Sequence, residues 1–351
     1  MRSKERFLAA LNLRKVDRVP LFEFLDSRVL VKSLTGGWPQ QYNAEDAVEC
    51  SLRLGMDAVW IPFGGGCPGY SIASDSDIYI DEWGTTYKRT EYSWLYDAPI
   101  AYPVKTKKDL GKLKIPDATT SDRRKDIQYA LRLVKDRMAV IGGIDGPLTI
   151  AYLTMGYENL SLALYDDPKL VEKLHSIAND FLIEAAKKTI NAGVDAICVA
   201  EDLGFHSGPF FSPSCLREFT FPYLGELIQE IRKQDIPVLL HSDGNLNLIL
   251  DDLVEMGINA LHPLESDAYM DLEKLKEDYG KKFCLIGGIN HRVLVNGMPE
   301  DVKQEVMRTI EIASPGGGYI PSSDCGDWFD AMPLENIRAV IDTIKRCCYY
   351  Y

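Results

Sequence analysis

The chain has 351 residues, of which 46% are hydrophobic and 26% charged, as in an ordinary soluble globular protein. This length fits either two average domains or one α/β barrel. A formal net charge of −13 argues against binding the phosphate backbone of a nucleic acid, which requires a basic surface. No apolar run is long enough to cross a bilayer, and residues 1–20 lack the apolar core of a signal peptide, so we expect a cytoplasmic protein with reduced cysteines.

The first predicted element is a short amphipathic helix near the N-terminus, with Ser3 as its cap. After it, eight short apolar runs stop at polar or glycine residues, and segments with helical periodicity separate most of them. Gly193, Gly257 and Gly280 follow three of these helices and are predicted to be left-handed caps. The eight runs span residues 19–24, 57–63, 138–146, 195–202, 237–244, 259–265, 283–290 and 318–325.

This alternation predicts a closed (β/α)8 TIM barrel, because continuous apolar strands are typical of a parallel sheet buried on both faces. We expect one domain over residues 1–351. Residues 64–137 are too many for one helix, and "DIYIDEWGTTYKRTEYSWLYD" alternates and turns like a β-hairpin, which predicts an insertion after the second strand. An open doubly wound sheet is the competing fold, but no GxGxxG follows the first strand.

In such barrels the reacting residues lie at the carboxyl ends of the strands. One group there combines the ligand types of a catalytic Zn²⁺: the imidazole of His241, the thiol of Cys325 and a carboxylate, either Glu201 or Asp243. Each of these residues also has a structural interpretation. The histidine could close a strand, Asp243 could cap the next helix, Glu201 could pair with an arginine, and the cysteine could be an inert core thiol.

Other polar and aromatic side chains are candidates for binding a substrate. We predict this role for Glu23, Asp145, His262 and Trp83. His262 has the alternative of being a hydrogen-bonded core residue. The aromatic residues of the insertion either stack on an aromatic substrate or pack the hairpin onto the barrel; they are Trp83, Tyr87, Tyr92 and Trp94.

The sequence resembles the uroporphyrinogen decarboxylase superfamily, specifically its branch of cobalamin-dependent methyltransferases and decarboxylase-like proteins. Four segments carry the resemblance: "EDLGFHSGPFFSPSCLREFTFPYLGELIQEI", "VLLHSDGNLNLILDDLVEMGINALHPLE", "LKEDYGKKFCLIGGINHRVLVNGMPEDV" and "GGGYIPSSD". It covers most of the chain, is weakest between residues 64 and 137, and implies the same barrel.

The first strand distinguishes this chain from the decarboxylases of that superfamily. They carry an Arg-Gln-Ala-Gly-Arg-Tyr stretch whose arginines hold the acidic groups of the porphyrinogen. Here the corresponding stretch is "FEFLDSRVLVKSLTGG", with Glu23, Asp26 and a lone Arg28. Carboxylates facing a polyanionic substrate would repel it, so decarboxylation is not expected.

The methyltransferase branch carries a zinc site of the form His-x-Cys on the fifth strand, completed by a cysteine near the eighth. His241 matches the histidine, Asp243 stands in place of the first cysteine, and Cys325 matches the last cysteine. The departure at Asp243 puts a coenzyme M acceptor in doubt. It fits relatives that take a methyl group from a small donor, such as a methoxylated aromatic, and pass it to a corrinoid protein.

The resemblance therefore implies a zinc-dependent, O-demethylating methyltransferase whose cobalamin is carried by a partner protein. Zn²⁺ would act as a Lewis acid on the donor oxygen. Glu201 is the preferred third ligand beside His241 and Cys325, Asp243 is the alternative, and a proton for the leaving oxygen comes from Asp243, His262 or water. Methyl transfer to coenzyme M is the alternative function, and a homodimer is one expectation for the oligomeric state.

Overall fold

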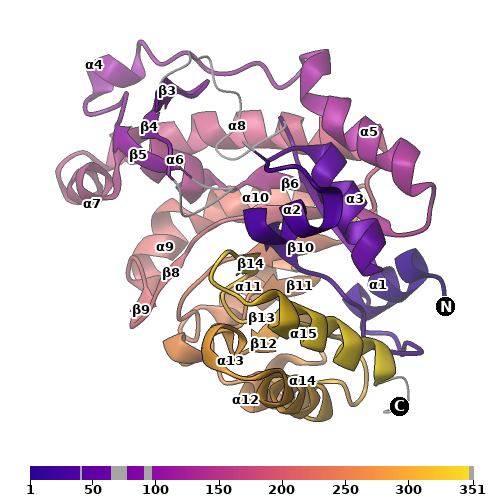
Figure 1. The fold of residues 1–351 in the computed structure, drawn as a ribbon. Coiled ribbons are helices and arrows are strands. Elements are labelled where there is room, and N and C mark those ends of the chain that lie inside the picture. Colours follow the sequence, from indigo (N-terminus) through magenta and orange to yellow (C-terminus); the bar gives the residue numbers. More distant parts are fainter. Residues whose placement is uncertain (40–41, 65–76, 91–96, 348–351) are drawn as a thin grey trace.

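The computed structural model describes residues 1–351 except 40–41, 65–76, 91–96 and 348–351. Its centre is a curled sheet of seven parallel strands in the order β13-β12-β11-β10-β7-β6-β2 (Figure 1). Every residue of these strands is buried except Asp145 and Ala200, which explains the continuous apolar runs of the sequence. The strands, all of which lie within predicted runs, are β2 (Ala58–Pro62), β6 (Ala139–Asp145), β7 (Ala196–Ala200), β10 (Val238–His241), β11 (Ala260–His262), β12 (Cys284–Ile289) and β13 (Tyr319–Ser323).

The first of the eight predicted strands differs from its prediction. The strand predicted at residues 19–24 begins only at Phe24, and β1 (Phe24–Asp26) pairs with β14 (Asp327–Phe329) rather than with a strand of the main sheet. The segment before it nevertheless bridges the two edges of that sheet. Asp57 donates its backbone N–H to the carbonyl of Leu21 over 2.8 Å, and Ser323 donates its backbone N–H to Glu23 over 2.7 Å. The molecule is therefore the predicted (β/α)8 barrel, closed partly through side chains.

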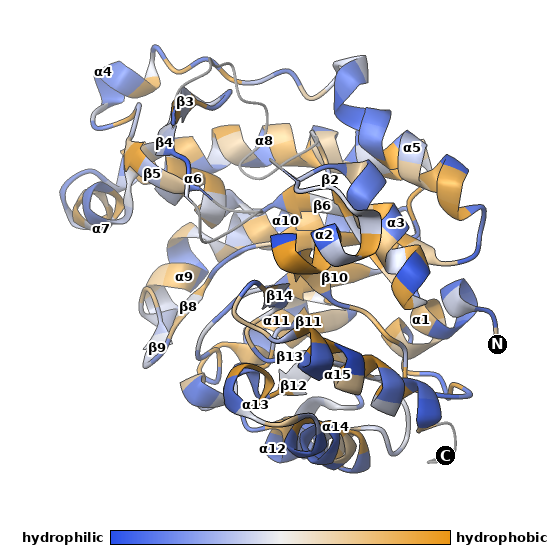
Figure 2. Ribbon diagram, viewed as in Figure 1, coloured by the Kyte–Doolittle hydropathy of each residue, from blue (hydrophilic) through white to orange (hydrophobic). Residues whose placement is uncertain are grey.

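Helices surround the sheet and turn their apolar sides toward it. In α5, for example, the buried residues Ile127, Ala130 and Val134 recur at helical spacing. Figure 2 shows the polar residues of the outer helices on their solvent side. The helices are α1 (Ser3–Leu11), α2 (Arg28–Thr35), α3 (Ala44–Leu54), α4 (Lys107–Leu110), α5 (Lys125–Val134), α6 (Pro147–Met155), α7 (Tyr157–Asp166), α8 (Pro168–Ala192), α9 (Pro213–Phe219), α10 (Phe221–Arg232), α11 (Leu250–Met256), α12 (Leu272–Tyr279), α13 (His291–Asn296), α14 (Pro299–Ala313) and α15 (Leu334–Arg346).

Two of the three predicted glycine caps are left-handed. Gly193 has a φ of 104° and Gly257 a φ of 85°, as expected where a helix turns into a short loop. Gly280 instead keeps a right-handed φ of −62°, so that prediction was wrong. Within the described residues, no helix is both long and apolar enough to span a membrane.

The insertion after β2 contains the predicted hairpin and one more strand. β3 (Ile78–Ile80), β4 (Thr86–Lys88) and β5 (Ala98–Ala101) form an antiparallel sheet. The insertion is fixed to the barrel helices, because Thr85 donates its hydroxyl to the carbonyl of Leu153 in α6 over 2.7 Å. Tyr92 and Trp94 lie outside the described residues.

Candidate active site

A cavity of about 300 Å³ opens at the carboxyl ends of the strands and is lined in part by residues of the insertion. Of the residues predicted to form the site, six line this cavity: Trp83, Tyr87, Asp145, His241, Asp243 and Cys325. Three others, described below, are buried behind its wall; they are Glu23, Glu201 and His262.

His241 is oriented by a second histidine. The two residues face each other as the last residues of β10 and β11, and their Nδ1 atoms are 2.9 Å apart. One of these nitrogens must donate the hydrogen. If His241 donates, its Nε2 keeps a lone pair toward the cavity, which is the arrangement a metal-binding histidine needs. Burial holds the pKa of His262 well below its usual range, which suits a neutral acceptor. His262 is completely buried, and its Nε2 has no hydrogen-bond partner among the described residues.

Asp243 lies on the cavity side of His241. One carboxylate oxygen is 4.0 Å from the Nε2 atom of His241, and the other has no hydrogen-bond partner within the described part of the chain. Burial raises the pKa of this carboxyl group to about 6, against the opposing effect of the neighbouring imidazole. The carboxylate of Asp202 lies near His241 and Asp243. One potential metal-ligand atom from each of the three residues lies within 4.8 Å of the other two.

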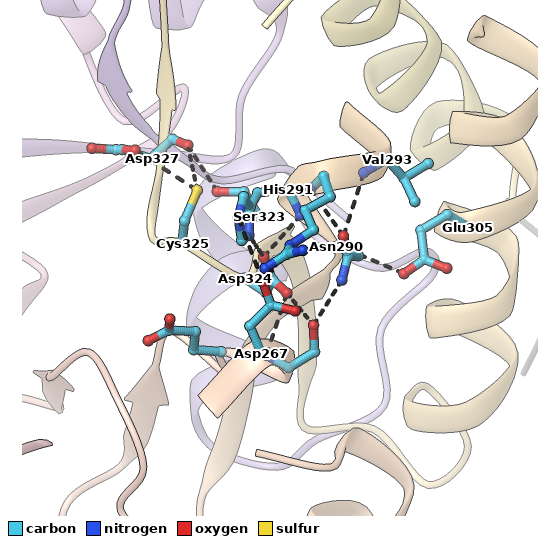
Figure 3. A network of polar contacts seen from close by, with 12 residues as sticks. Asp267, Asn290, His291, Val293, Glu305, Ser323, Asp324, Cys325 and Asp327 are labelled. Atoms are coloured by element: carbon cyan, nitrogen blue, oxygen red, sulfur yellow. Dashed lines mark hydrogen bonds and ion pairs between the residues drawn. The ribbon is translucent and has the colours of Figure 1, made fainter. Parts of the chain in front are cut away.

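Cys325 lines the same cavity from the loop between β13 and β14. Its thiol lies within 4.8 Å of ligand atoms of His291 and Asp324 and does not belong to the group of His241, Asp243 and Asp202. Gly326 makes the approach of this loop to His241 possible, because a Cβ atom there would lie 3.2 Å from the Cε1 atom of His241. The cysteine Sγ is 3.5 Å from the backbone carbonyl of Asp327 (Figure 3). Burial raises the pKa of the thiol, and Asp327 raises it further. A cation at this position would favour the thiolate.

A buried network holds the cysteine loop in position. Asp324 accepts hydrogen bonds from the backbone and Nδ1 of His291, over 2.9 and 2.7 Å, and from the hydroxyl of Ser266 (Figure 3). The hydrogen bond to Asp324 raises the pKa of His291. The ligand atoms of Asp324, His291 and Cys325 are close enough to form a cluster. Both carboxylate oxygens of Asp324 nevertheless already accept hydrogen bonds, so we assign Asp324 a structural role.

Glu201, predicted as a metal ligand, points into the fold instead of into the cavity. Its two oxygens accept hydrogen bonds from the backbone N–H groups of Leu148 and Thr149, each over 2.8 Å, at the start of α6. The side chain is completely buried, and burial raises its pKa to about 8. The carboxylate that the structure brings to His241 from this strand end is the next residue, Asp202.

Glu23, predicted to contact a substrate, also has its contacts inside the barrel wall. It accepts hydrogen bonds from the Ser322 hydroxyl and the Ser323 backbone, over 2.8 and 2.7 Å. Burial raises its pKa to about 7. The contacts of Glu23 join the first strand segment to β13. Glu23 is not among the residues that line the cavity.

The carboxyl group of Asp145, at the end of β6, accepts no hydrogen bond from a described residue, and the charged groups that act on it are Glu82, Asp81 and Asp202. Burial raises its pKa to about 7, with a further contribution from these acidic neighbours. Trp83 lines the same cavity and packs edge-on against Phe181, with ring centroids 5.2 Å apart. Both predicted roles of this tryptophan, packing and lining the site, are therefore compatible with its position.

Several residues that line the cavity are not among the predicted site residues; among them are Trp60, Arg123, Asp202 and Asp327. Trp60 lies inside an apolar strand, where nothing in the pattern distinguishes the lumen from the helix side. Asp327 could have been found from its position two residues after Cys325.

Residues 81–347 match the family model described as Uroporphyrinogen decarboxylase (URO-D). The chain belongs to the URO-D family. This confirms the resemblance inferred from the four sequence segments. A solved structure described as a methyltransferase from Methanosarcina mazei covers 98% of this chain and 98% of its own, with a TM-score of 0.78 and 23% identity. That likeness supports the barrel fold.

Relatives within the URO-D family carry two kinds of name. The methylcobamide:CoM methyltransferase MtaA of Methanosarcina barkeri is 24% identical over 96% of each chain. The uroporphyrinogen decarboxylase of Anaeromyxobacter dehalogenans is 25% identical over 97% of each chain. Because these identities are nearly equal, the choice between the two activities depends on the site.

Proposed function

We propose that this URO-D family protein is a zinc-dependent methyltransferase that moves a methyl group between a small O-methyl compound and the cobalamin of a corrinoid protein. The observation that carries the proposal is that His241, Asp243 and Cys325 line one cavity, with a carboxylate oxygen of Asp243 4.0 Å from the Nε2 atom of His241. The similarity to MtaA, whose name gives a methylcobamide as its substrate, supports the corrinoid partner. A homodimer and a methoxylated aromatic donor stay predictions.

The residues present fit a zinc ion. The set offers one imidazole nitrogen, one thiol sulfur and one carboxylate oxygen, which are the protein ligands that Zn²⁺ accepts in catalytic sites. The buried carboxylate oxygen of Asp243 without a hydrogen-bond partner is a polar atom that a cation would satisfy. When bound there, Zn²⁺ supplies Lewis-acid activation of the methylated oxygen. We therefore prefer Asp243 over Glu201 as the carboxylate ligand, because both oxygens of Glu201 accept backbone hydrogen bonds.

The protein's own residues then have distinct tasks. His262 holds the imidazole of His241 in one orientation and tautomer. Being completely buried, His262 cannot reach a substrate, and Asp243 as a metal ligand would be deprotonated, so a proton for the leaving oxygen comes from water. The aromatic rings of Phe24, Trp60 and Trp83 exclude water around the apolar body of a donor.

The first test is metal content. Purified wild-type protein is expected to contain about one zinc ion per chain, because the chain has one proposed zinc site. His241→Ala is expected to lose the zinc, and His206→Ala, a matched change of an exposed histidine, to keep it. Elemental analysis measures all three proteins, and absence of stoichiometric zinc from the wild type would end the proposal.

The direction of transfer needs a second measurement. A cob(I)alamin-loaded corrinoid protein and a panel of methoxylated aromatics should yield methylcobalamin, which is followed by its absorbance. Transfer only from methylcobalamin to a thiol would favour the coenzyme M reaction instead. That second candidate is supported by the names of MtaA and MtbA, and opposed by the aspartate at position 243.

Decarboxylation of a porphyrinogen is less well supported. Among the described residues that line the cavity, Arg123 is the single lysine or arginine, and its guanidinium pairs with Glu82. A polyanionic substrate would meet mainly carboxyl groups.

A further inference from the structure

The cavity carries a large excess of acidic groups. Its lining contains one arginine, Arg123, which donates to Glu82 through two guanidinium nitrogens. The positions outside the described residues contain no lysine, arginine or histidine, so they add no positive side chain. The six carboxyl groups of the lining are Glu82, Asp97, Asp145, Asp202, Asp243 and Asp327.

A metal ion at His241 would compensate only some of these acids. Asp202 and Asp243 cluster with His241, whereas Asp145 is not in that group. The charged groups that act on Asp145 belong to Asp81 and Glu82 of the insertion and to Asp202, and all three are acidic; Glu82 and Asp202 line the same cavity. A buried carboxyl group without a hydrogen-bond donor or a counter-charge is costly, and a positive ligand would remove that cost.

The walls around these acids are aromatic. Trp60, Trp83, Tyr87 and Tyr152 line the cavity, and the faces of such rings attract cations. The ring of Trp60 is 8% exposed and forms part of this aromatic wall. The volume of about 300 Å³ is sufficient for a small organic molecule.

We propose that the small-molecule substrate is an organic cation, whose quaternary or protonated ammonium group lies between Asp145 and the aromatic wall while its methylated oxygen reaches His241. This inference rests on the proposed methyl transfer and specifies its substrate class. A cationic substrate distinguishes this chain from the relatives. Their names specify either coenzyme M or a porphyrinogen, and both of these molecules are anionic. Acids and aromatic faces together recognise a positive group, and would reject a negative one.

The test uses three probes of similar shape and different charge. They are meta-methoxyphenyl-trimethylammonium, its neutral isostere meta-tert-butylanisole, and the anion meta-methoxybenzoate. Calorimetric titration of the wild-type protein should show the cation binding about tenfold or more tightly than the neutral isostere, with the anion weakest. Equal or tighter binding of the neutral or anionic probe would overturn the inference.

Variants identify the part of the cavity responsible. Asp145→Asn should abolish most of the preference for the cation over its isostere, whereas Asp342→Asn, a matched change on the exposed side of α15, should keep it. An unchanged preference in Asp145→Asn would contradict the assigned position. The comparison of probes on the wild type needs no variant, so a folding defect in Asp145→Asn leaves it decisive.

The two proposals can fail separately. His241→Ala should lose zinc and still prefer the cation. Cation preference in a protein without zinc or methyl transfer would refute the proposed function alone. Zinc-dependent methyl transfer from anionic donors, with no preference for the cation, would refute the substrate class alone.

Discussion

Glu201 and Asp202 are neighbours in the chain, yet their carboxyl groups have different surroundings. Glu201 turns back to accept two backbone hydrogen bonds at the start of α6, and Gly146 leaves room for it, since a Cβ atom there would lie 2.3 Å from its carboxyl carbon. Asp202 instead points toward Tyr152 and Asp243 in the cavity. The first residue therefore anchors a helix, and the second contributes negative charge to the site.

This difference predicts how Glu201→Gln behaves. The pKa of Glu201 is raised in the folded state to about 8, so the folded protein holds this proton more tightly than the unfolded chain. The resulting stability is present in full at low pH and is lost as the pH rises through the folded pKa. Between about pH 6 and about pH 9 the wild type should lose about 2 kcal/mol of unfolding free energy through this group.

Glu201→Gln lacks the ionisable group and should show a correspondingly flatter pH profile in urea denaturation. Its zinc content should equal that of the wild type. Glu311→Gln, an exposed change on α14, is the control and should retain the wild-type profile. Loss of zinc from Glu201→Gln would show instead that this residue is a metal ligand.

At the residue level the sequence indicated which side chains lie at strand ends, but not which way each one turns. His241, Asp243 and Cys325 line one cavity because parallel strands of a barrel end on one face. The partners of Glu201 and Glu23 are backbone N–H groups of α6 and β13, up to 300 positions away in the chain. Such partners depend on the assembled barrel and leave no local pattern.

The strands β2 and β6 give the site its tryptophan wall. They pair in parallel, with Pro62 opposite Gly143, and a Cβ atom at Gly143 would lie 2.4 Å from the Nε1 atom of Trp60. Gly143→Ala should therefore displace the Trp60 ring. We expect a KM raised about tenfold, the effect of losing one aromatic contact, with zinc content unchanged.

Gly225→Ala on α10 is the matched control for that change. The nearest atom to a Cβ there is 3.8 Å away, so the alanine fits and should stabilise the helix by about 0.5 to 1 kcal/mol without altering KM. Steady-state kinetics and urea denaturation measure both variants. An unchanged KM in Gly143→Ala would contradict a substrate contact of Trp60.

The elements themselves followed from periodicity, with one exception. Seven strands lie within their predicted runs because burial on both faces makes a strand continuously apolar. In the first predicted run, only Phe24 belongs to a strand. Residues 19–23 instead join the two sheet edges largely through the side chains of Asp57 and Glu23, without a regular ladder of backbone hydrogen bonds. An apolar pattern shows burial, and it does not show which backbone groups pair.

For the whole molecule, closure of the barrel depends on a buried ionic group at the end opposite the cavity. Asp57, just before β2, is completely buried and accepts hydrogen bonds from Arg6, Arg18 and the backbone of Leu21 over 2.7 to 2.8 Å. These contacts tie α1 and the first strand segment to the sheet. Removing one partner of such a group leaves buried charges without compensation.

Asp57→Asn should therefore lower the unfolding free energy by about 3 kcal/mol, because two guanidinium groups lose their shared carboxylate. Urea denaturation at neutral pH measures the loss, with Asp342→Asn as the exposed control. Below its lowered unfolding temperature the variant should still bind zinc, since Asp57 lies at the amino end of β2 and the cavity at the carboxyl ends of the strands. A loss below about 1 kcal/mol, the range of exposed ion pairs, would show that barrel closure does not depend on this group.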